Sequence, residues 1–360
     1  MKNIIFIISD ITSGGGMQRV TINIANYLSN LNKYNVKIIS LAKGDGKIKY
    51  YVDDKVKVEC LSIEKFKLRR DFFKAGKKLK EIVPKNFEGT VIVDDVGYTI
   101  TTYLALNKHK NIKLVCWTHM HYYHGRSFGF AGVGRRLAMC KFDKIILLTK
   151  EDYDNYAKLD KRDIRVQIYN PIDKDIENSN YSSVSKKIIS CGRLNRIKGF
   201  DYLIEAAKIV LKKHPDWTWD IYGEGPEFNN LNMKIKEYKL ENNLFLKGYS
   251  KDILSLYKEY SMYVFTSRDE GCPMAMIEAQ ASGLPMISFD FRCGPKDLIS
   301  DGVNGFIIKD YDINEIANKI NYMIENKDKR VSFSNNSKVN LKELELDYVL
   351  NKWQDLLDNL

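Results

Sequence analysis

Short apolar runs rich in Ile and Val alternate with longer mixed segments through the first half of the chain. Such runs are typical of parallel strands that helices cover on both faces. Strands are predicted at "NIIFIIS", "VKIISLA", "TVIVDD", "IKLVCWT" and "KIILLT", and helices over residues 17–31, 98–107 and 129–140. This half is therefore predicted to form one doubly wound α/β domain.

The alternation stops at Asn170 and Pro171 and restarts after the polar stretch "KDIENSNYSSVSKK", which has the composition of a linker. Strands are then predicted at "KIISCGR", "WTWDIYG", "NLFLKGY", "MYVFTS", "LPMISFD" and "GFIIKD", with helices over residues 200–213 and 273–282. The pattern predicts an α/β fold of two Rossmann-like domains, 1–170 and 187–342, joined by a linker over 171–186 and facing each other across a cleft. Ligands of such sheets bind at the carboxyl ends of the strands.

Composition narrows the class of protein. The chain has 360 residues, 44% of them hydrophobic and 29% charged, which is enough for two globular cores. The six cysteines have no paired spacing, which argues against disulfides and a zinc site and fits a reducing cytosol. The apolar start is too short for a signal peptide, and no later run is long enough to span a membrane. Any membrane association is therefore expected to be peripheral.

The net charge of +11 is concentrated in particular stretches. Residues 65–80, "KFKLRRDFFKAGKKLK", combine basic residues with an apolar stripe at helical spacing. This pattern is typical of a helix lying on anionic lipid, although a surface helix with an ordinary core side fits it equally well. Residues 126–142, "RSFGFAGVGRRLAMCKF", are a second candidate. Neither stretch matches a nucleic-acid-binding motif, so no nucleic-acid partner is expected.

A glycine-rich turn follows the first predicted strand, in "SDITSGGGMQRV". Gly15 and Gly16 allow a ligand to approach the backbone at the start of a helix, which suits an anionic or sugar-phosphate ligand. A dinucleotide fingerprint would require a third glycine where Arg19 stands, which disfavours an oxidoreductase. The alternative is a tight turn that is glycine-rich for purely structural reasons.

Two cations stand in the corresponding loop of the second domain, Arg193 and Lys198 in "CGRLNRIKGF". Like charges crowded at the start of a helix favour a bound anion. A diphosphate would contact both, with Arg193 making directed hydrogen bonds and Lys198 acting as a point charge. The alternative is that both residues are solvated surface cations.

The stretch "TSRDEGCPMAMIEAQASG" places Glu270 on a turn and Glu278 inside an apolar helix. Sugar hydroxyls can donate to Glu270 and accept from the first-turn amides of Met274 and Ala275. A buried carboxylate at Glu278 requires donors, which the two hydroxyls of a ribose would supply. The alternative is a helix cap and a paired core glutamate.

Together, "SGGGMQRV", "WTHMHYY", "GRLNRIKG" and "EGCPMAMIEA" resemble glycosyltransferase family 4, of the type that assembles bacterial polysaccharides. The resemblance implies the two-domain GT-B fold and transfer of a sugar from a nucleotide diphosphate sugar with retention of configuration. It also implies that residues 343–360, with "YVLNKWQDLL", form a helix that crosses back to the first domain. The first domain would lie on the acceptor side, and the second would bind the donor.

The resemblance assigns roles to particular residues. Catalytic contacts would come from Arg193 and Lys198 on the diphosphate, Glu270 on the transferred sugar, and His119 near the sugar and acceptor. Glu278 would bind the ribose. The further donor contacts would be Gly15, Gly16, Tyr249, Met274 and Ala275. No resident cofactor is expected, and the donor is predicted to be a UDP-sugar.

Three features qualify the resemblance. Cys272 stands where the family usually has a bulky apolar residue, and Asp297 where it more often has a glutamate. His119, His121 and His124 are predicted not to hold a metal, because histidines in an extended loop lack a fixed geometry and the family is typically metal-independent.

The expected reaction is same-face attack, with the departing phosphate oxygen accepting the acceptor's proton, because no residue is an obvious nucleophile for a double displacement. The predicted acceptor is a saccharide or lipid-linked saccharide in capsule, exopolysaccharide or lipopolysaccharide synthesis. The protein is expected to be cytoplasmic and peripheral at the inner face of the cell membrane, held to anionic lipid by its first domain. The alternative is a nucleotide-sugar epimerase or phosphorylase of the same fold.

Overall fold

The computed structural model describes residues 1–44, 46–64, 66–172, 181–339 and 341–360. The chain divides into two compact units, Met1–Asn170 with Asp347–Leu360, and Pro171–Leu346. Residues 173–180 of the predicted linker lie outside the described residues, as does Lys65 of the basic stretch. Within the described ranges, no helix is long and apolar enough to cross a membrane.

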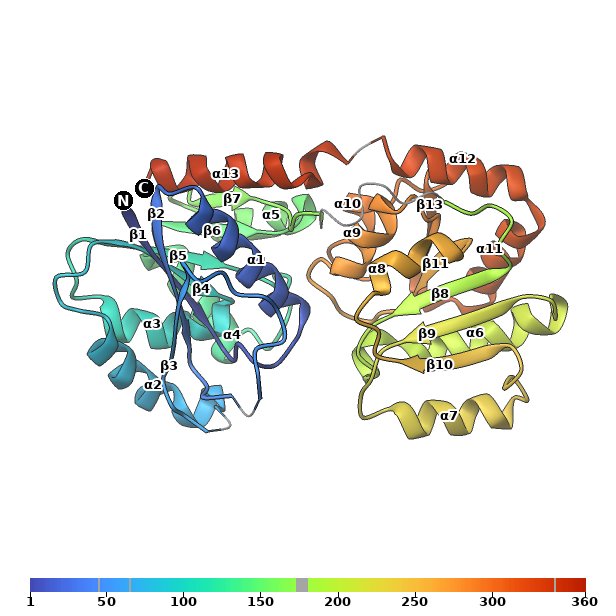
Figure 1. Cartoon of the computed structure of the whole chain (residues 1–360), viewed down its shortest axis with the longest axis horizontal. Coiled ribbons are helices and arrows are strands. Elements are labelled where there is room, and N and C mark those ends of the chain that lie inside the picture. Colours follow the sequence, from blue (N-terminus) through green and yellow to red (C-terminus); the bar gives the residue numbers. More distant parts are fainter. Residues whose placement is uncertain (45, 65, 173–180, 340) are drawn as a thin grey trace. The chain divides into compact units, whose positions relative to one another are not determined.

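The first unit is built on a seven-stranded sheet of parallel strands in the order β3-β2-β1-β4-β5-β6-β7 (Figure 1). Its strands are β1 (Lys2–Ile8), β2 (Tyr34–Ser40), β3 (Lys57–Cys60), β4 (Gly89–Asp94), β5 (Ile112–Trp117), β6 (Lys144–Leu147) and β7 (Arg165–Gln167). Its helices are α1 (Gly16–Asn30), α2 (Leu68–Ile82), α3 (Thr99–Leu106), α4 (Phe130–Lys141), α5 (Lys150–Tyr156) and α13 (Leu346–Asp358). The strand order reverses between β1 and β4, which is where such sheets bind ligands.

The C-terminal helix α13 packs on the first unit. Side chains of β1 alternate between the two faces of the sheet, so Ile5 and Ile7 join one buried cluster while Phe6 faces the other way. Phe6 contacts Trp353 of α13, with ring centroids 6.2 Å apart, and Trp117 lies 4.8 Å from the same indole. The predicted return of the C-terminal helix to the first domain is confirmed.

The second unit repeats the plan with a six-stranded parallel sheet in the order β10-β9-β8-β11-β12-β13. Its strands are β8 (Lys187–Cys191), β9 (Thr218–Tyr222), β10 (Leu244–Gly248), β11 (Met262–Phe265), β12 (Met286–Phe289) and β13 (Gly305–Ile308). Its helices are α6 (Phe200–Lys213), α7 (Phe228–Glu237), α8 (Ile253–Leu256), α9 (Met274–Ala281), α10 (Pro295–Leu298), α11 (Ile313–Glu325) and α12 (Lys327–Ser337). The order reverses between β8 and β11. Two Rossmann-like α/β units are confirmed.

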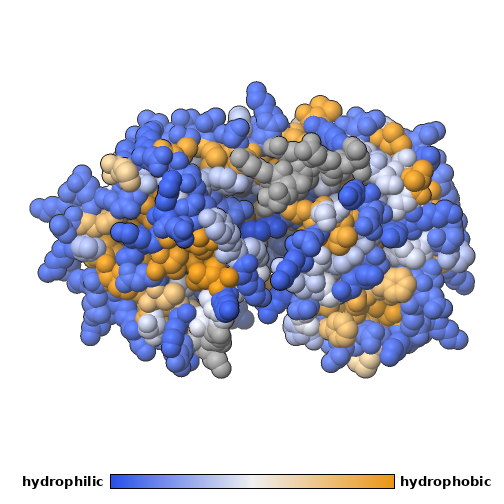
Figure 2. All heavy atoms as spheres, in the orientation of Figure 1, coloured by the Kyte–Doolittle hydropathy of each residue, from blue (hydrophilic) through white to orange (hydrophobic). Residues whose placement is uncertain are grey.

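The predicted strands and helices are all present, and two further strands complete the first sheet. These are β3 and β7, which are short and only partly buried. They are the two edge strands of the sheet and lack the continuous apolar run that marks a central strand. Figure 2 shows a mostly hydrophilic face, with apolar side chains gathered in places on each unit.

Candidate functional site

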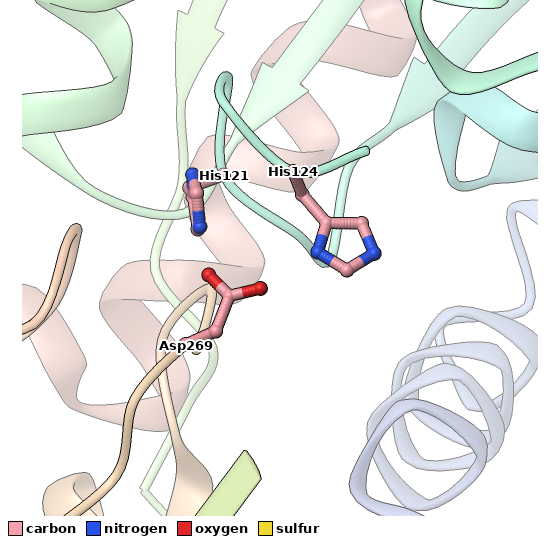
Figure 3. Close-up of side chains that lie close together, drawn as sticks. All are labelled: His121, His124 and Asp269. Atoms are coloured by element: carbon pink, nitrogen blue, oxygen red, sulfur yellow. The ribbon is translucent and has the colours of Figure 1, made fainter. Parts of the chain in front are cut away.

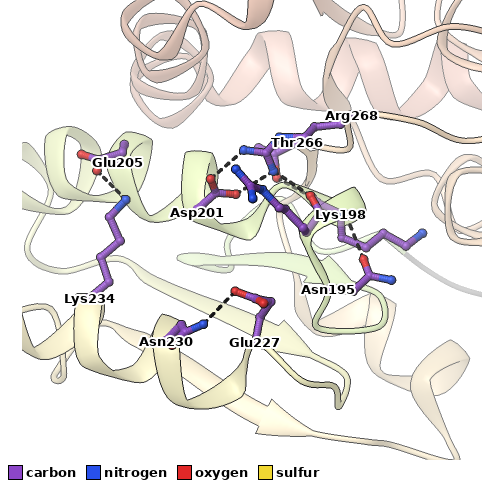
Figure 4. Close-up of polar contacts among 10 residues, drawn as sticks. Asn195, Lys198, Asp201, Glu205, Glu227, Asn230, Lys234, Thr266 and Arg268 are labelled. Carbon is purple, nitrogen blue, oxygen red and sulfur yellow. Dashed lines mark hydrogen bonds and ion pairs between the residues drawn. The ribbon is translucent and has the colours of Figure 1, made fainter.

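Two loops of the second unit meet where its strand order reverses, one after β8 and one after β11 (Figure 4). Thr266 Oγ1 donates to Lys198 O at 3.2 Å. Arg268 N donates to Ile197 O at 2.7 Å. Gly199 adopts a φ of +64°, and a Cβ there would lie 2.0 Å from Thr266 O. Only glycine allows this approach, so the glycine of "RIKGF" lets the two loops touch.

Arg268 fastens the two loops together. Its guanidinium makes a two-pronged ion pair with Asp201, at 2.8 and 2.6 Å, and donates to Arg196 O at 2.7 Å. It also lies 3.9 Å from the centroid of the Tyr202 ring. Arg268 is therefore a structural residue of the site that sequence patterns did not identify, because its partners lie in the loop after β8 and in the first turn of α6.

Lys198 and Glu270 form an ion pair across these loops. Lys198 Nζ lies 2.5 Å from Glu270 Oε1, and Ser267 Oγ donates to the same oxygen at 2.9 Å. Their side chains are 21% and 14% exposed, so the pair is shielded but still reachable from solvent. The sequence predicted both residues for different parts of a ligand, and the structure brings them into contact with each other.

Arg193 lies earlier in the loop after β8. Its side chain is exposed and has no ion-pair partner among the described residues. The loop after β9 supports the backbone on either side of it. A Cβ at Gly223 would lie 1.9 Å from Gly192 O, and a Cβ at Gly225 would lie 2.3 Å from Leu194 O. The two glycines of "YGEGP" are thus a signal in the sequence for this close packing.

Glu278 lies on α9 and is buried. Tyr257 Oη donates to its Oε2 at 3.0 Å. Burial raises the pKa of Tyr257, which keeps the phenol protonated as a donor. The Oε2 atom of Glu278 is thus bonded as the alternative interpretation, a paired core glutamate, expects. Ribose binding by Glu278 stays a prediction.

The start of α9 is fixed by the loop after β12. Pro273 is the N-cap residue, and Met274 and Ala275 begin the helix, where amides have no acceptor within the helix. A Cβ at Gly294 would lie 3.3 Å from Pro273 Cδ. Cys272 is buried, and burial raises the pKa of its thiol, so it packs as a small neutral side chain.

Tyr249 follows β10 at the edge of the second sheet. Gly223 N donates to Gly248 O at 2.8 Å, which ties the loop after β10 to the loop after β9. The Tyr249 side chain is 59% exposed. No hydrogen bond or ring contact between described residues joins it to the Lys198–Glu270 pair, so its role stays a prediction.

The glycine turn of the first unit lies at the carboxyl end of β1. Gly15 is the N-cap residue of α1 and its N–H donates to Gln18 Oε1 at 3.2 Å. Gln18 Nε2 in turn donates to Asp10 O at 3.1 Å. These bonds fix the turn and leave α1 starting at Gly16, with first-turn amides that have no acceptor within the helix.

The loop after β5 carries His121 and His124, both labelled in Figure 3. Tyr123 N donates to His121 Nδ1 at 3.1 Å, and His124 N donates to His121 O at 2.9 Å. Arg135 Nη2 donates to His124 O at 3.0 Å. The expectation that this loop lacks a fixed geometry is therefore wrong, because its own backbone and α4 hold it.

His119 precedes them on the same loop and is buried against Trp117, with ring centroids 4.5 Å apart. Burial lowers the pKa of His119 to about 3, so the imidazole is neutral at physiological pH. It can therefore donate or accept a hydrogen bond without carrying charge. Within each unit taken by itself, no described group of three His, Cys, Asp or Glu side chains is close enough to share an ion. Metal independence stays a prediction.

Two acids, Asp94 and Asp95, lie at the carboxyl end of β4, on the sheet edge that also carries the glycine turn and the His119 loop. The sequence patterns did not identify them as site residues. Asp94 is fully buried, and burial raises its pKa well above the ordinary value. Its Oδ2 is hydrogen-bonded to Thr21 Oγ1, which also donates to Met17 O at 3.0 Å. Because a hydroxyl has one proton, Thr21 can donate to Met17 O and keep its bond to Asp94 only when Asp94 is protonated and donates to Thr21. The signal for them in the sequence is the pair of adjacent acids directly after the apolar run in "TVIVDD".

Comparisons with known proteins cover nearly the whole chain. The family described as "Glycosyltransferase Family 4" matches residues 14–176, and "Glycosyl transferases group 1" matches residues 171–340. An uncharacterized glycosyltransferase of Haemophilus influenzae is 32% identical over 363 residues, which cover 99% of this chain and 100% of that protein. The chain is a family 4 glycosyltransferase.

This glycosyltransferase is also similar to the amylovoran biosynthesis glycosyltransferase AmsD of Erwinia amylovora, with 29% identity over 99% of the chain and 100% of AmsD. The solved structure of an S. aureus TarM mutant with fondaparinux, alpha-GlcNAc-glycerol and UDP has a TM-score of 0.84 to the transferase. That likeness covers 99% of this chain and 100% of TarM at 19% identity, and it confirms the GT-B fold.

Proposed function

We propose that this glycosyltransferase transfers a hexosyl or N-acetylhexosaminyl unit from a UDP-sugar to a saccharide hydroxyl, with retention at the anomeric carbon. The observation that carries the proposal is the Lys198–Glu270 pair at the carboxyl edge of the second sheet, in the loops that also carry Arg193 and lead into α9. The similarity to TarM, whose structure contains UDP and alpha-GlcNAc-glycerol, supports the choice of nucleotide. The UDP-sugar is a substrate, and the proposal includes no resident cofactor.

The donor diphosphate would replace Glu270 as the counter-charge of Lys198. Arg193 would make directed hydrogen bonds to phosphate oxygens, and the amides of Met274 and Ala275 would add uncharged donors. Glu270, released from Lys198, would then accept from hydroxyls of the transferred sugar. Before the donor binds, the ion pair would thus hold Lys198 and Glu270 in place. The donor would then offer the diphosphate to Lys198 and the sugar hydroxyls to Glu270.

The nucleoside would lie toward Glu278. Its carboxylate would accept from the ribose hydroxyls while Tyr257 keeps Oε2 oriented. Tyr249 stays a predicted contact of the nucleotide, and Gly15 and Gly16 stay predicted contacts of the donor.

In the proposed step, the bond between the anomeric carbon and the phosphate oxygen breaks while the acceptor hydroxyl attacks from the same face. The acceptor oxygen forms the new bond, and its proton passes to the departing phosphate oxygen of UDP. Arg193 and Lys198 would stabilise the charge that develops on this leaving group, where transition-state binding is most effective. Neutral His119 would orient the sugar or the acceptor through a hydrogen bond. The scheme uses no metal and no enzyme nucleophile.

The similarity to AmsD supports a role in the synthesis of a surface polysaccharide, with a saccharide or lipid-linked saccharide as the acceptor. We propose that the protein is cytoplasmic and works against the inner face of the cell membrane. Such an acceptor would be presented at the anionic lipid surface, so the first unit would need a face that binds lipid.

A surface formed by α2, α4 and the segment before α4 fits that requirement. Phe72 of α2 and Phe130 of α4 have ring centroids 5.2 Å apart, which joins the two basic stretches into one surface. On it Phe73 is 70% exposed and Phe128 is 89% exposed. The exposed basic side chains beside them include Arg69, Lys74, Lys77, Lys80, Arg126 and Arg136. Exposed aromatic rings among cations suit an anionic lipid interface.

Co-sedimentation with vesicles rich in anionic lipid tests this surface. The double variant Lys74→Glu, Lys77→Glu should lose binding, whereas Lys212→Glu, Lys236→Glu makes the same charge change on exposed helix positions of the second unit and should retain most of it. Equal losses in both variants, or no binding by the wild type, would remove the membrane from the proposal.

The activity is tested by incubating the protein with UDP- and GDP-linked sugars, with and without saccharide acceptors, and separating the products by chromatography. We expect UDP release that depends on an acceptor. Formation of an epimer of the donor sugar without an acceptor would contradict transfer. Binding of UDP should also raise the Tm by mass action, which identifies the nucleotide even before the acceptor is known.

A further inference from the structure

The backbone of Asp95 is strained at the point where β4 ends. Its φ of +91° and ψ of 147° lie in a region that glycine adopts and other residues rarely do. β4 is the neighbour of β1 where the order of the first sheet reverses. A glycine at this position would avoid the strain, so the side chain of Asp95 has to contribute something that glycine lacks.

The Asp95 carboxylate caps its own turn, and the Asp95 N–H donates to Trp117 O at the end of β5, at 2.7 Å. Gly97 N donates to Oδ1 at 3.0 Å, which caps the short helix η1 (Val96–Tyr98). Burial raises the pKa of Asp95, while the Gly97 N–H and the charges of His124 and Arg135 favour its charged form. Two of these three groups lie outside the turn, so capping alone does not account for the acid.

Arg135 is a buried cation that holds the same loop. Its Nη2 donates to His124 O at 3.0 Å, and its Nε donates to Tyr156 Oη at 3.3 Å. Its guanidinium lies 4.8 Å from the centroid of the Tyr122 ring. The loop that carries His119 is therefore fastened to α4 through one arginine.

Close packing brings α4 to the turn that follows Asp95. A Cβ at Gly134 would lie 2.0 Å from Val96 O, and Thr99 Oγ1 lies within hydrogen-bond distance of both Val96 O and Gly134 O, at 2.8 and 3.0 Å. This approach sets Arg135, the next residue of α4, near the charge of Asp95 in a buried environment. A cation and an anion held in this way restrict each other's position more than either would alone.

We propose that Asp95 is a positioning residue of the transfer reaction: together with Arg135 it fixes the loop 119–124 and so holds His119 in place. The strained backbone is retained because glycine would supply neither the charge nor the hydrogen-bond acceptor. This inference rests on the proposed function, in which His119 orients the sugar or the acceptor.

The variant Asp95→Gly relieves the strain and removes the charge. We expect its Tm to stay close to the wild-type value, because the relief offsets the lost cap of η1. We expect kcat to fall about a hundredfold, the size of effect that misplacing a reacting group produces. The donor KM should change little. Asp95→Asn keeps an acceptor for the Gly97 N–H, so its kcat should lie between those of the wild type and Asp95→Gly.

Asp163→Gly is the matched control, because Asp163 is also an aspartate of the first unit with a positive φ, +53°, and is exposed. Its kcat should stay at the wild-type value. Hydrogen exchange of the amides in residues 118–124 gives a readout that needs no activity, and it should be faster in both Asp95 variants and unchanged in Asp163→Gly.

The outcomes separate this inference from the proposed function. If the wild type transfers no sugar but the Asp95 variants exchange faster in the loop, the proposed function fails and the anchoring of the loop stands. Unchanged loop exchange in Asp95→Asn, or a kcat equal to that of Asp163→Gly, would overturn the inference. A Tm that falls steeply in both Asp95 variants would also overturn it, since Asp95 would then act on stability alone.

Discussion

The carboxyl edges of the two sheets hold their acidic residues in opposite ways. In the second unit, Glu270 and Glu278 each accept from a partner of the same unit, an ammonium in one case and a phenol in the other. In the first unit, Asp94 is buried and Asp95 is half-buried, both have raised pKa values, and Asp95 has a strained backbone. Glu270, whose ion pair is reachable from solvent, can exchange its partner for a ligand, whereas Asp94 and Asp95 bond to groups inside the fold and Asp95 is also strained.

The difference suggests that donor recognition and loop positioning are built by separate parts of this glycosyltransferase. Substitutions at the second edge should change the kinetics of transfer with little change in stability. Substitutions at the first edge should change the order of a loop or the pH dependence of stability as well. Each prediction below tests one side of this contrast.

The largest effect is expected from Lys198→Ala, because it removes the cation that would face the leaving diphosphate. We expect kcat/KM to fall about a thousandfold, as for other losses of a group that stabilises transition-state charge. Arg193→Ala should lower it about a hundredfold. Arg196→Ala removes an exposed arginine of the same loop and should have little effect, as measured by UDP release. If Arg196→Ala lowered kcat/KM as much as Arg193→Ala, the loss would reflect the positive charge of the loop in general and not a defined contact.

The two glutamates should separate binding from turnover. Glu278→Gln should raise the donor KM about tenfold with a small change in kcat, because it would weaken the proposed ribose contact equally in the ground and transition states. Glu270→Gln should mainly lower kcat, because the proposed ligand of Glu270 is the transferred sugar. Steady-state kinetics with varied donor gives both values. The reverse pattern would undo the assignment of the two residues.

Asp94→Asn should change how stability depends on pH. The folded-state pKa of Asp94 lies above the unfolded value of 3.8, so the wild type loses stability as the pH rises from about that value toward the folded pKa. The asparagine variant has no such titrating group. At pH 4 the substitution should lower the free energy of unfolding by no more than about 1 kcal/mol. At neutral pH the variant should be as stable as the wild type or more stable.

Denaturant unfolding of both proteins between pH 4 and pH 8 measures this difference. The free energy of unfolding of Asp94→Asn should rise relative to that of the wild type as the pH rises. A constant difference would mean that Asp94 is ionised in the fold and that its bond to Thr21 has the opposite direction.

The smallest effect is expected from removing divalent cations. In the proposed mechanism Arg193 and Lys198 supply the positive charge opposite the diphosphate, so activity measured after treatment with EDTA should remain within about twofold of the untreated value. A loss that Mg²⁺ or Mn²⁺ restores would show that these two cations are not sufficient for the leaving group.

Much of the fold and part of the site could be predicted from local patterns. Apolar runs mark the central strands because both faces of a parallel sheet are covered, and the edge strand β3 escapes because its side chains are only partly buried. Glycines and charges in short stretches identified Lys198 and Glu270 separately. Their contact could not be predicted, because it joins residues 72 positions apart. The strain at Asp95 could not be predicted either, because it depends on how α4 and the loop after β5 pack around one peptide.

The most direct test of the central claim is a time course of ¹H NMR spectra with a UDP-α-linked sugar and a saccharide acceptor. The proposed same-face transfer predicts an α-linked product from its first appearance, with UDP released in equal amount. A β-linked first product, or consumption of the donor without any transfer, would contradict it.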